Sequence, residues 1–589
     1  RTLATAMAAG HPSPCAPEVS EMTGIAAHAD LPGSGRGLGI VELLSARVVA
    51  GAALGLLLIV QFTQVFRRAI NWDEFWHYNH LIQFQNSELA RPLNTLHVRA
   101  FSWVTDLPGN AVDHIVVIRL FMFGCELVIV AGIVALATRF TDRVTGLLCA
   151  LAYISFPFVF QHGYSFRFDP PSTALMMGSL WLLAVRPLDW RSVLGAGLLI
   201  GTALMVTIKI VLLLPAFAGV LWWRWSEQRF AWSYVARVAV TGAIALATAG
   251  AIFALHSQGI AGAASENAAD IVEGSGATMF ALEAKPYWPI AIAAAQMAPL
   301  VTLLLALFPF TLWKSKATRP EKIALIGLYL PLTTLLFYHN TAPYYYVFML
   351  PWVLIACSIA MPYINARITA SGTAALFLVF GLIGYAFEED SPIDKQRALI
   401  DTAYATFPKN TAYFDFMGML AEQPKANPFV TPATLKQYHL ANRSIYRAAM
   451  EERPVPLLVD DDFQFQQLFA EPYVPTLTEG GVPHFSPDDA EALRDTYLHW
   501  WGPFYLAGEE VPAGPQSYRF QIRVPGPYTV EGNPLAMDGT TYRPGDVVML
   551  ERGPHAITGP RAKPARIIWG ERLRRPSTAA PDKPYFMGW

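Results

Sequence analysis

Residues 48–66 read VVAGAALGLLLIVQFTQVF, a run of 19 residues without a charged side chain. About 20 consecutive apolar residues are enough to cross a lipid bilayer. The run is long for the apolar part of a secretory signal peptide and no small-residue cleavage site accompanies it, so we expect a retained first membrane helix. Residues 1–37 are rich in Ala, Gly, Pro and Ser without periodicity, and we expect them to be disordered.

Ten further apolar stretches follow the first one. The eleven candidate spans are 48–66, 114–138, 144–161, 172–185, 192–207, 210–223, 232–255, 289–313, 323–338, 347–363 and 368–387. Two of them, 192–207 and 210–223, are short for a full crossing. A hairpin with Lys209 at its tip uses this length best, and one long bent helix is the alternative. The sequence therefore predicts a polytopic α-helical membrane protein.

Basic side chains in the short loops predict the orientation, because cytoplasmic loops carry an excess of Lys and Arg. The loops that carry them alternate along the chain. Their basic residues are Arg139, Arg143, Arg186, Arg191, Arg224, Arg229, Lys314, Lys316, Arg319, Lys322 and Arg367. With eleven spans, this places the C-terminal part on the opposite, periplasmic side of the inner membrane.

Charged side chains become about twice as dense after residue 387. Residues 388–589 hold 46 of them in 202 positions, whereas the first 387 residues hold 42. The dense part is expected to be a folded extramembrane tail without cysteines, and no basic run indicates a nucleic-acid partner. We predict an α/β segment at 388–511, with a helix at 433–452 and a buried strand at 456–459. Pro-Gly and Asp-Gly turns predict a small antiparallel β module at 512–589.

The stretch NWDEFWHYNH at 71–80 follows the first span. The adjacent carboxylates of Asp73 and Glu74 are suited to act as a general base or to hold a divalent cation. The aromatic residues around them equally fit an interfacial helix whose acids are solvated. A zinc site at Asp73, His77 and His80 is a third interpretation, less favoured because no Cys or further ligand motif accompanies it.

Other polar residues fall in the loops predicted on the outer side. Arg167 and Asp169 precede two prolines, a pattern that also starts helices. Lys209 stands alone in an apolar stretch, either to meet a lipid phosphate or to reach the interface from a helix end. His339 and Tyr345 belong to a Tyr-rich loop, and an aromatic belt explains the tyrosines without a ligand.

The second span carries two charges of opposite sign. Arg119 and Glu126 lie seven residues apart, which places them on one face of a helix. Unpaired charges inside a membrane are costly. The spacing therefore predicts a structural ion pair between these two side chains.

The order of these motifs resembles that of the GT-C glycosyltransferases that use polyprenyl-phosphate sugars, especially the superfamily of protein O-mannosyltransferases and the lipid A aminoarabinose transferase. The resemblance covers about residues 40–390 and implies a catalytic membrane domain at 38–387. The matching elements are Asp73-Glu74, Arg119-Leu120, Arg167-Phe168-Asp169-Pro170, the Gly-rich Gly195–Pro215 with Lys209, and Pro343–Pro351. One element departs from the family, because the expected His/Pro-rich stretch reads Arg91-Pro92-Leu93-Asn94-Thr95-Leu96-His97.

The resemblance implies transfer of a hexose or pentose, with inversion, from a polyprenyl-phosphate donor to an acceptor hydroxyl at the outer face. Asp73 is the implied general base, with Glu74 beside it. The implied substrate-binding residues are Arg167, Asp169, Lys209, His339 and Tyr345. Lys209 is expected to stabilise the leaving phosphate. No cofactor is implied beyond a divalent cation, which is left open, and the acceptor is a glycan, a lipid or a protein.

A carrier or flippase for lipid-linked glycans, with an external sugar-binding domain, is the alternative function. A transporter is expected to spread polar groups through the membrane midplane and to show internal repeats. Here the polar groups fall at one side of the predicted bundle and no repeat is seen. The enzyme is therefore the favoured interpretation.

Overall fold

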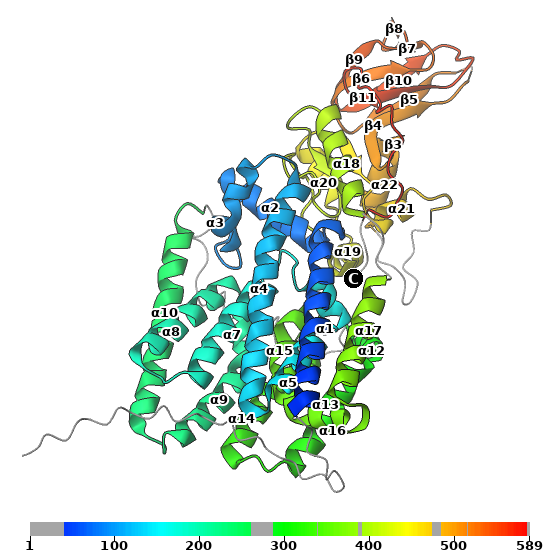
Figure 1. The fold of residues 1–589 in the computed structure, drawn as a ribbon. Coiled ribbons are helices and arrows are strands. Elements are labelled where there is room, and N and C mark those ends of the chain that lie inside the picture. Colours follow the sequence, from blue (N-terminus) through cyan, green and yellow to red (C-terminus); the bar gives the residue numbers. More distant parts are fainter. Residues whose placement is uncertain are drawn as a thin grey trace, which may run out of the picture.

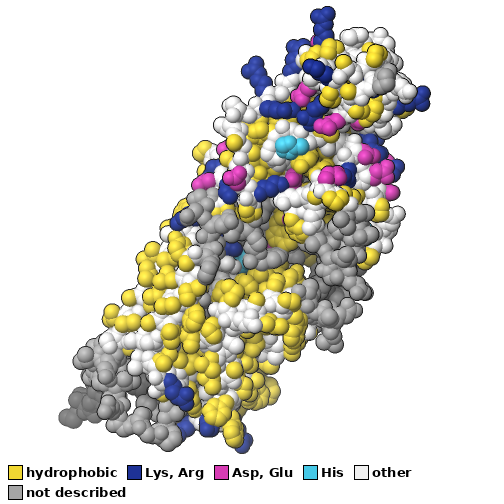
Figure 2. All heavy atoms as spheres, turned by 90° about the vertical axis from the view of Figure 1, so that its right-hand side faces the viewer, with side chains coloured by type: hydrophobic (Ala, Val, Ile, Leu, Met, Phe, Trp, Pro, Cys, Tyr) yellow, Lys and Arg dark blue, Asp and Glu magenta, His cyan; other side chains and the backbone are white. Residues whose placement is uncertain are grey.

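The computed structural model describes residues 40–260, 287–338, 340–386, 392–430, 432–473, 485–514 and 516–585. The chain forms a helical part and an α/β part that sits on one end of it (Figure 1). The N-terminal segment 1–37, expected to be disordered, and His339 lie outside the described residues. On the face shown in Figure 2, hydrophobic side chains cover the helical part and charged ones gather over the α/β part.

Each predicted apolar stretch is helical over most of its length, although several stretches are divided into shorter pieces. With η for 3-10 helices, the elements are α1 (Ile40–Arg67), α2 (Trp72–Gln85), α3 (His97–Phe101), η1 (Ser102–Asp106), α4 (Ala111–Phe140), α5 (Arg143–Ile154), α6 (Pro157–His162), α7 (Asp169–Val185), α8 (Trp190–Val206), η2 (Ile208–Leu213), α9 (Leu214–Glu227), α10 (Trp232–Ser257), α12 (Trp288–Met297), α13 (Pro299–Lys314), α14 (Arg319–Tyr329), η4 (Leu330–Leu336), α15 (Tyr345–Cys357), η5 (Ser358–Ala360), α16 (Met361–Ile368) and α17 (Ala370–Ala386).

Within the described ranges, five helical segments are long and apolar enough to cross a membrane, and a sixth counts if α12 and α13, which meet at 101°, form one span. The five are Ser45–Arg67, Ala111–Phe140, Ile208–Glu227, Trp232–Ser257 and Tyr345–Ile368. The predicted number of eleven spans is therefore not confirmed. Proline explains part of the division, because Pro157, Pro299 and Pro331 each stand in the first turn of a new helix.

The segments α8 and α9 form a hairpin, as favoured from the sequence, and not one long bent helix. The Arg224 side chain near the end of α9 donates to the carbonyl oxygen of Arg186, just before α8, at 3.2 Å. Thr207, in extended conformation, ends α8, and η2 then makes the turn. Lys209 therefore lies at the tip, at the end of the bundle opposite to Arg186 and Arg224.

The described residues of the C-terminal part form five helices and two sheets. The helices are α18 (Pro392–Thr406), α19 (Pro432–Leu440), α20 (Tyr446–Glu452), α21 (Phe463–Leu468) and α22 (Pro487–Thr496). The strands are β1 (Tyr413–Phe414), β2 (Leu457–Val459), β3 (Tyr497–Trp501), β4 (Phe504–Val511), β5 (Tyr518–Ile522), β6 (Gly526–Glu531), β7 (Leu535–Met537), β8 (Thr540–Tyr542), β9 (Val547–Leu550), β10 (Gly553–Thr558) and β11 (Ala565–Trp569). The predicted strand at 456–459 is confirmed by β2, whereas the predicted helix at 433–452 is divided into α19 and α20.

The larger sheet crosses the predicted boundary at residue 512. It has the order β1-β2-β4-β11-β6-β9, with β3 paired to β4. Only β1 and β2 are parallel, and the remaining pairs are antiparallel. The second sheet has the order β5-β10-β7-β8, and the predicted Asp538-Gly539 turn joins β7 to β8 with both residues at positive φ.

The α/β part docks on α2 and on the start of α4. Gln396 of α18 accepts from the backbone N–H of Ile70 at 2.7 Å and donates to its carbonyl oxygen at 2.9 Å. Asn79 of α2 donates to the carbonyl oxygen of Gly418 at 2.7 Å. Phe75 of α2 shares one buried apolar cluster with Phe416. The tail therefore holds the helix that carries the acidic pair.

Candidate active site

The helix α2 begins immediately before the two acidic residues. Asn71 caps it by accepting from the N–H of Asp73 at 3.0 Å, and the Glu74 carboxylate accepts from the N–H of Asn71 at 2.9 Å. This reciprocal arrangement is a capping box, which satisfies N–H groups that a helix start leaves free. Asp73 and Glu74 are thereby fixed in the first turn, where the helix dipole favours negative charge.

Glu74 is completely buried and paired with Arg119 of α4. The Arg119 guanidinium donates to both carboxylate oxygens, at 2.8 and 2.5 Å, and the N–H of Phe166 donates to one of them at 2.8 Å. Burial alone would raise the pKa of Glu74, but Arg119 and these backbone donors hold it below its usual value. Glu74 thus ties α2 to α4 and to the segment before α7.

The predicted ion pair between Arg119 and Glu126 is wrong. Arg119 bonds to Glu74 and to the carbonyl oxygens of Arg68 and Ala69, while Glu126 accepts from the Tyr153 hydroxyl at 3.2 Å. The sequence spacing places both side chains on one helical face, yet it does not reveal that a carboxylate 45 residues earlier in the chain offers Arg119 two oxygens.

Four charged side chains, Asp73, Arg167, Asp169 and Lys209, form a continuous chain that we call the ion-pair cluster. Arg167 pairs with Asp73 and lies 3.5 Å from Asp169, and Asp169 pairs in turn with Lys209. The signs alternate, so the cluster is neutral as a whole. Apart from Asp73, whose side chain is 16% exposed, all members are less than a tenth exposed. Three motifs that lie far apart in the sequence therefore meet in the fold.

Each member of the cluster is placed by a local feature of the chain. Asp169 occupies the first position of α7, and Pro170 follows it, so the predicted helix start is confirmed. Lys209 is placed by the turn of the α8–α9 hairpin. Arg167 lies directly after Phe166, whose N–H is bound by Glu74. The buried Glu74 thus positions both ends of the Asp73–Arg167 pair.

The Asp73 carboxylate is more basic than an ordinary aspartate. Burial raises its pKa above the usual value, although the charge and hydrogen bond of Arg167 act in the opposite direction. Asp169 and Glu74 add to the rise through their negative charge. A partly exposed carboxylate with a raised pKa is suited to take a proton from an incoming hydroxyl.

Tyr344, which was not predicted, completes the surroundings of Arg167. The guanidinium carbon lies 3.2 Å from the centre of the Tyr344 ring, and the Tyr344 hydroxyl donates to Asn340 at 2.8 Å. The predicted Tyr345 is fully buried instead, and its hydroxyl is hydrogen-bonded to that of Thr334 at 2.6 Å. In a run of three tyrosines the sequence does not show which ring faces the cluster.

An apolar cavity of about 470 Å³ begins beside the cluster and runs between α4, α7 and α8. Arg167, His77 and His97 contribute to its lining at one end, and residues such as Leu175 and Leu199 line the remainder. Along α7 the cavity extends from Pro171 to Gly178, which corresponds to about 10 Å of helix. Its volume is in the range of ligand pockets.

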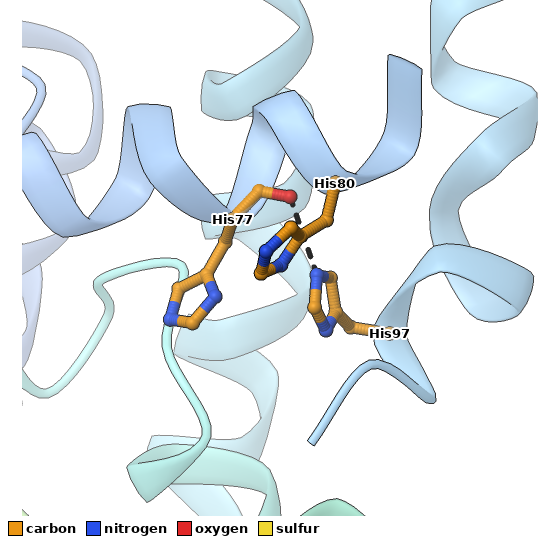
Figure 3. A group of neighbouring side chains, drawn as sticks. All are labelled: His77, His80 and His97. Carbon is orange, nitrogen blue, oxygen red and sulfur yellow. Dashed lines mark hydrogen bonds between the residues drawn. The ribbon is translucent and has the colours of Figure 1, made fainter. Parts of the chain in front are cut away.

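Three histidines form a second polar group (Figure 3), and two of them, His77 and His97, line the same end of the cavity. His77 and His80 extend from α2, and His97 begins α3; their candidate ligand nitrogens all lie within 4.8 Å of one another. Burial lowers the pKa of His77 well below its usual value, that of His80 to about 4 and that of His97 to about 3, so the rings are neutral at pH 7. Asp73 is not part of this group, so the structure does not assemble the ligand set Asp73, His77 and His80.

Comparisons with known proteins add two findings. The model of the family described as dolichyl-phosphate-mannose-protein mannosyltransferase matches residues 101–251. This stretch includes Arg119, Arg167, Asp169 and Lys209. No curated protein matches the sequence.

Among solved structures, the oligosaccharyltransferase of Archaeoglobus fulgidus in its apo form matches with a TM-score of 0.51 and 10% identity, over 91% of this chain and 97% of that one. ArnT from Cupriavidus metallidurans in the apo state matches with a TM-score of 0.48 and 13% identity, over 72% and 96% of the two chains. The same enzyme bound to undecaprenyl phosphate matches with a TM-score of 0.46 and 11% identity, over 64% and 84%. The fold is therefore similar to that of the GT-C membrane glycosyltransferases, as the resemblance predicted.

Proposed function

We propose that the chain is an integral-membrane glycosyltransferase that moves a sugar, with inversion, from a polyprenyl-phosphate donor to an acceptor hydroxyl at the outer face of the inner membrane. The description of the matching family model supports a lipid-phosphate-linked sugar as donor. The observation that carries the proposal is the position of the ion-pair cluster at the end of an apolar cavity, with Arg167 belonging to both.

A polyprenyl-phosphate sugar has an apolar chain and a charged phosphate, and each part matches one part of this site. Its polyprenyl chain enters the apolar cavity between α4, α7 and α8, where burial of hydrocarbon is favourable. Its phosphate meets the guanidinium of Arg167, which lines the end of the cavity, and the ammonium of Lys209, which belongs to the same ion-pair cluster. These cations are paired with Asp169 before the donor binds, so the charge of the phosphate competes with that carboxylate.

Asp73 is the general base of the reaction. Its carboxylate takes the proton of the acceptor hydroxyl while the acceptor oxygen forms a bond to the anomeric carbon. The bond from that carbon to the phosphate oxygen breaks, and polyprenyl phosphate leaves with the electron pair. Arg167 and Lys209 stabilise the negative charge that gathers on the leaving group in this buried site.

Glu74 and Asp169 have supporting roles in this mechanism. The carboxylate of Glu74 is fully occupied by Arg119 and backbone donors, so it positions Asp73 and Arg167 rather than contacting sugar. Asp169 holds Lys209 and lies close to Arg167. The periplasmic α/β part is proposed to form one wall of the acceptor path, because it holds α2 in place.

The test separates an enzyme from a carrier of lipid-linked glycans. Purified protein in detergent is incubated with a polyprenyl-phosphate sugar radiolabelled in the sugar and with extracted membrane acceptors. The enzyme yields labelled acceptor and an equal amount of free polyprenyl phosphate. A carrier moves the labelled lipid between leaflets in proteoliposomes and releases no free polyprenyl phosphate, and that result would overturn the proposal.

A further inference from the structure

The three histidines beside the cavity converge from two separate segments. His77 and His80 are three residues apart on α2, which places them on one face of that helix. His97 is the first residue of α3 and reaches the same space from the opposite side (Figure 3). The ring centres of His77 and His97 are 5.1 Å apart, and those of His80 and His97 are 5.7 Å apart.

A backbone hydrogen bond fixes the proton of His97. Its Nε2 lies 3.2 Å from the carbonyl oxygen of His77, and a carbonyl oxygen only accepts, so Nε2 carries the hydrogen. The lone pair of the neutral ring is therefore on Nδ1. Metal-binding histidines characteristically donate their other ring N–H to a carbonyl or carboxylate in this way.

The Nδ1 atoms of all three rings are buried and have no hydrogen-bond partner among the described residues. Buried polar atoms without a partner are rare and costly, so three of them in one place call for a ligand. Aromatic rings surround the group: Trp76 lies 4.5 Å from the His80 ring centre, and Phe168 lies 4.3 Å from that of His77.

We propose that His77, His80 and His97 bind one divalent transition-metal ion of the zinc class, with the fourth position open to water. Three imidazoles without a carboxylate favour zinc over magnesium or calcium, which prefer oxygen ligands. Nitrogens bound to zinc at about 2.1 Å are about 3.4 Å apart in a tetrahedral site. One candidate nitrogen of each ring lies within 4.8 Å of the other two, so these atoms approach one another by up to about 1.4 Å through ring rotations when the ion binds.

The ion joins the start of α3 to α2 where both contribute to the donor cavity. His77 and His97 line that cavity together with Leu96, so the metal site forms part of its wall. The metal site is distinct from the Asp73–Arg167 pair, which supplies the proposed chemistry. It therefore goes beyond the proposed transferase function and does not depend on it.

The experiment measures metal binding without any donor lipid. Full-length protein is treated with a chelator, re-equilibrated with micromolar zinc and desalted, and bound zinc is counted by mass spectrometry. The wild type retains about one zinc per chain. His80→Ala and His97→Ala each lose it, because removal of a ligand weakens binding by more than the roughly 10- to 100-fold typical of an outer-shell partner. His499→Gln, at an exposed tail position, is the matched control and keeps its zinc.

Cobalt provides a second readout on the same proteins. Three nitrogens and one water give Co²⁺ a tetrahedral site with visible absorption, which the wild type and His499→Gln show. His80 is partly exposed, so His80→Ala is the variant that tests the site with the least change to the buried core. Wild-type protein without stoichiometric zinc, or zinc retained in full by His80→Ala and His97→Ala, would overturn the proposal. Neither result decides the transferase proposal, because the radiolabelled-donor assay measures sugar transfer and not metal binding.

Discussion

Asp73 and Glu74 are neighbours in the chain, yet their side chains have different surroundings. Asp73 is partly exposed and pairs with Arg167 at the end of the cavity, whereas Glu74 is fully buried against Arg119. Two adjacent acids were predictable as a motif, but the division of roles was not. The role of each acid depends on which carboxylate faces α4. The residue at which α2 begins and the packing of α2 against α4 decide this orientation.

Replacement of Glu74 tests its structural role. Glu74→Gln leaves the buried Arg119 charge without its partner, and loss of one partner from a buried pair typically costs about 3–5 kcal/mol. We expect a clear fall in the thermal unfolding midpoint in detergent. Asp73→Asn should have a smaller effect on stability, because Asp73 is partly exposed and Arg167 keeps the Asp169 carboxylate at 3.5 Å. Equal midpoints for the two variants would contradict the assignment.

The pH dependence of transfer tests the coupling of Asp73 to Arg167. Asp73 must be ionised to act as base, so activity rises as the pH increases through its pKa. Arg167 lowers that pKa, and Arg167→Gln should therefore move the acid limb of the pH–rate profile to higher pH. Arg447→Gln, on the surface of the tail, serves as control. An acid limb that stays in place or moves to lower pH would refute the coupling.

Lys209 is expected to act on the donor more than on the acceptor. Lys209→Met combined with Asp169→Asn removes both charges of one pair, which avoids a buried unpaired carboxylate. A lost charge-assisted hydrogen bond to the donor phosphate corresponds to a rise in donor KM of about 10- to 100-fold. The acceptor KM should change little. An unchanged donor KM would remove Lys209 from the phosphate site.

Among the helices, the positions of the apolar stretches could be predicted from the sequence. The points at which a stretch is split into shorter helices could not. Hydrophobic length locates each stretch, but proline and tertiary contacts decide where a helix breaks. His97 was overlooked for a similar reason. It ends the stretch where the family pattern is altered, and its partners on α2 lie 17 and 20 residues away, beyond any helical spacing.

The pair α9 and α14 packs through glycine. A side chain on Gly219 would meet the backbones of Ala324 and Gly327 at 3.2 Å. Such small residues let helices approach closely in membranes. The position of α9 matters for the site because the turn before it carries Lys209.

Gly219→Val therefore forces the two helices apart and should destabilise the protein by about 1–3 kcal/mol, as overpacking does. The thermal midpoint in detergent measures this. Gly242→Val in α10 is the matched control, because nothing lies within 4 Å of the added side chain. If the two variants unfold at the same temperature, close packing at Gly219 is not important for stability.

At the scale of the whole molecule, the helical part and the tail act together on one helix. The tail forms hydrogen bonds with Ile70 and Asn79, which lie on either side of the acidic pair in the sequence. Arg119 of α4 binds Glu74 within that pair. The sequence separated the two parts by charge density, but it gave no sign that they share a buried core around Phe75. The proposed base is thus held by contacts from both parts of the chain.

The rate of sugar transfer by Asp73→Asn tests the assignment of Asp73 as the general base. Labelled product is followed with the purified variant, beside wild type and an Asp106→Asn control at an exposed position in the same segment between α1 and α4. Loss of a general base lowers the rate by at least about 100-fold. We expect that loss for Asp73→Asn alone, with an unfolding midpoint close to wild type. A well-folded Asp73→Asn protein that transfers sugar at the wild-type rate would contradict the assignment of Asp73 as the general base.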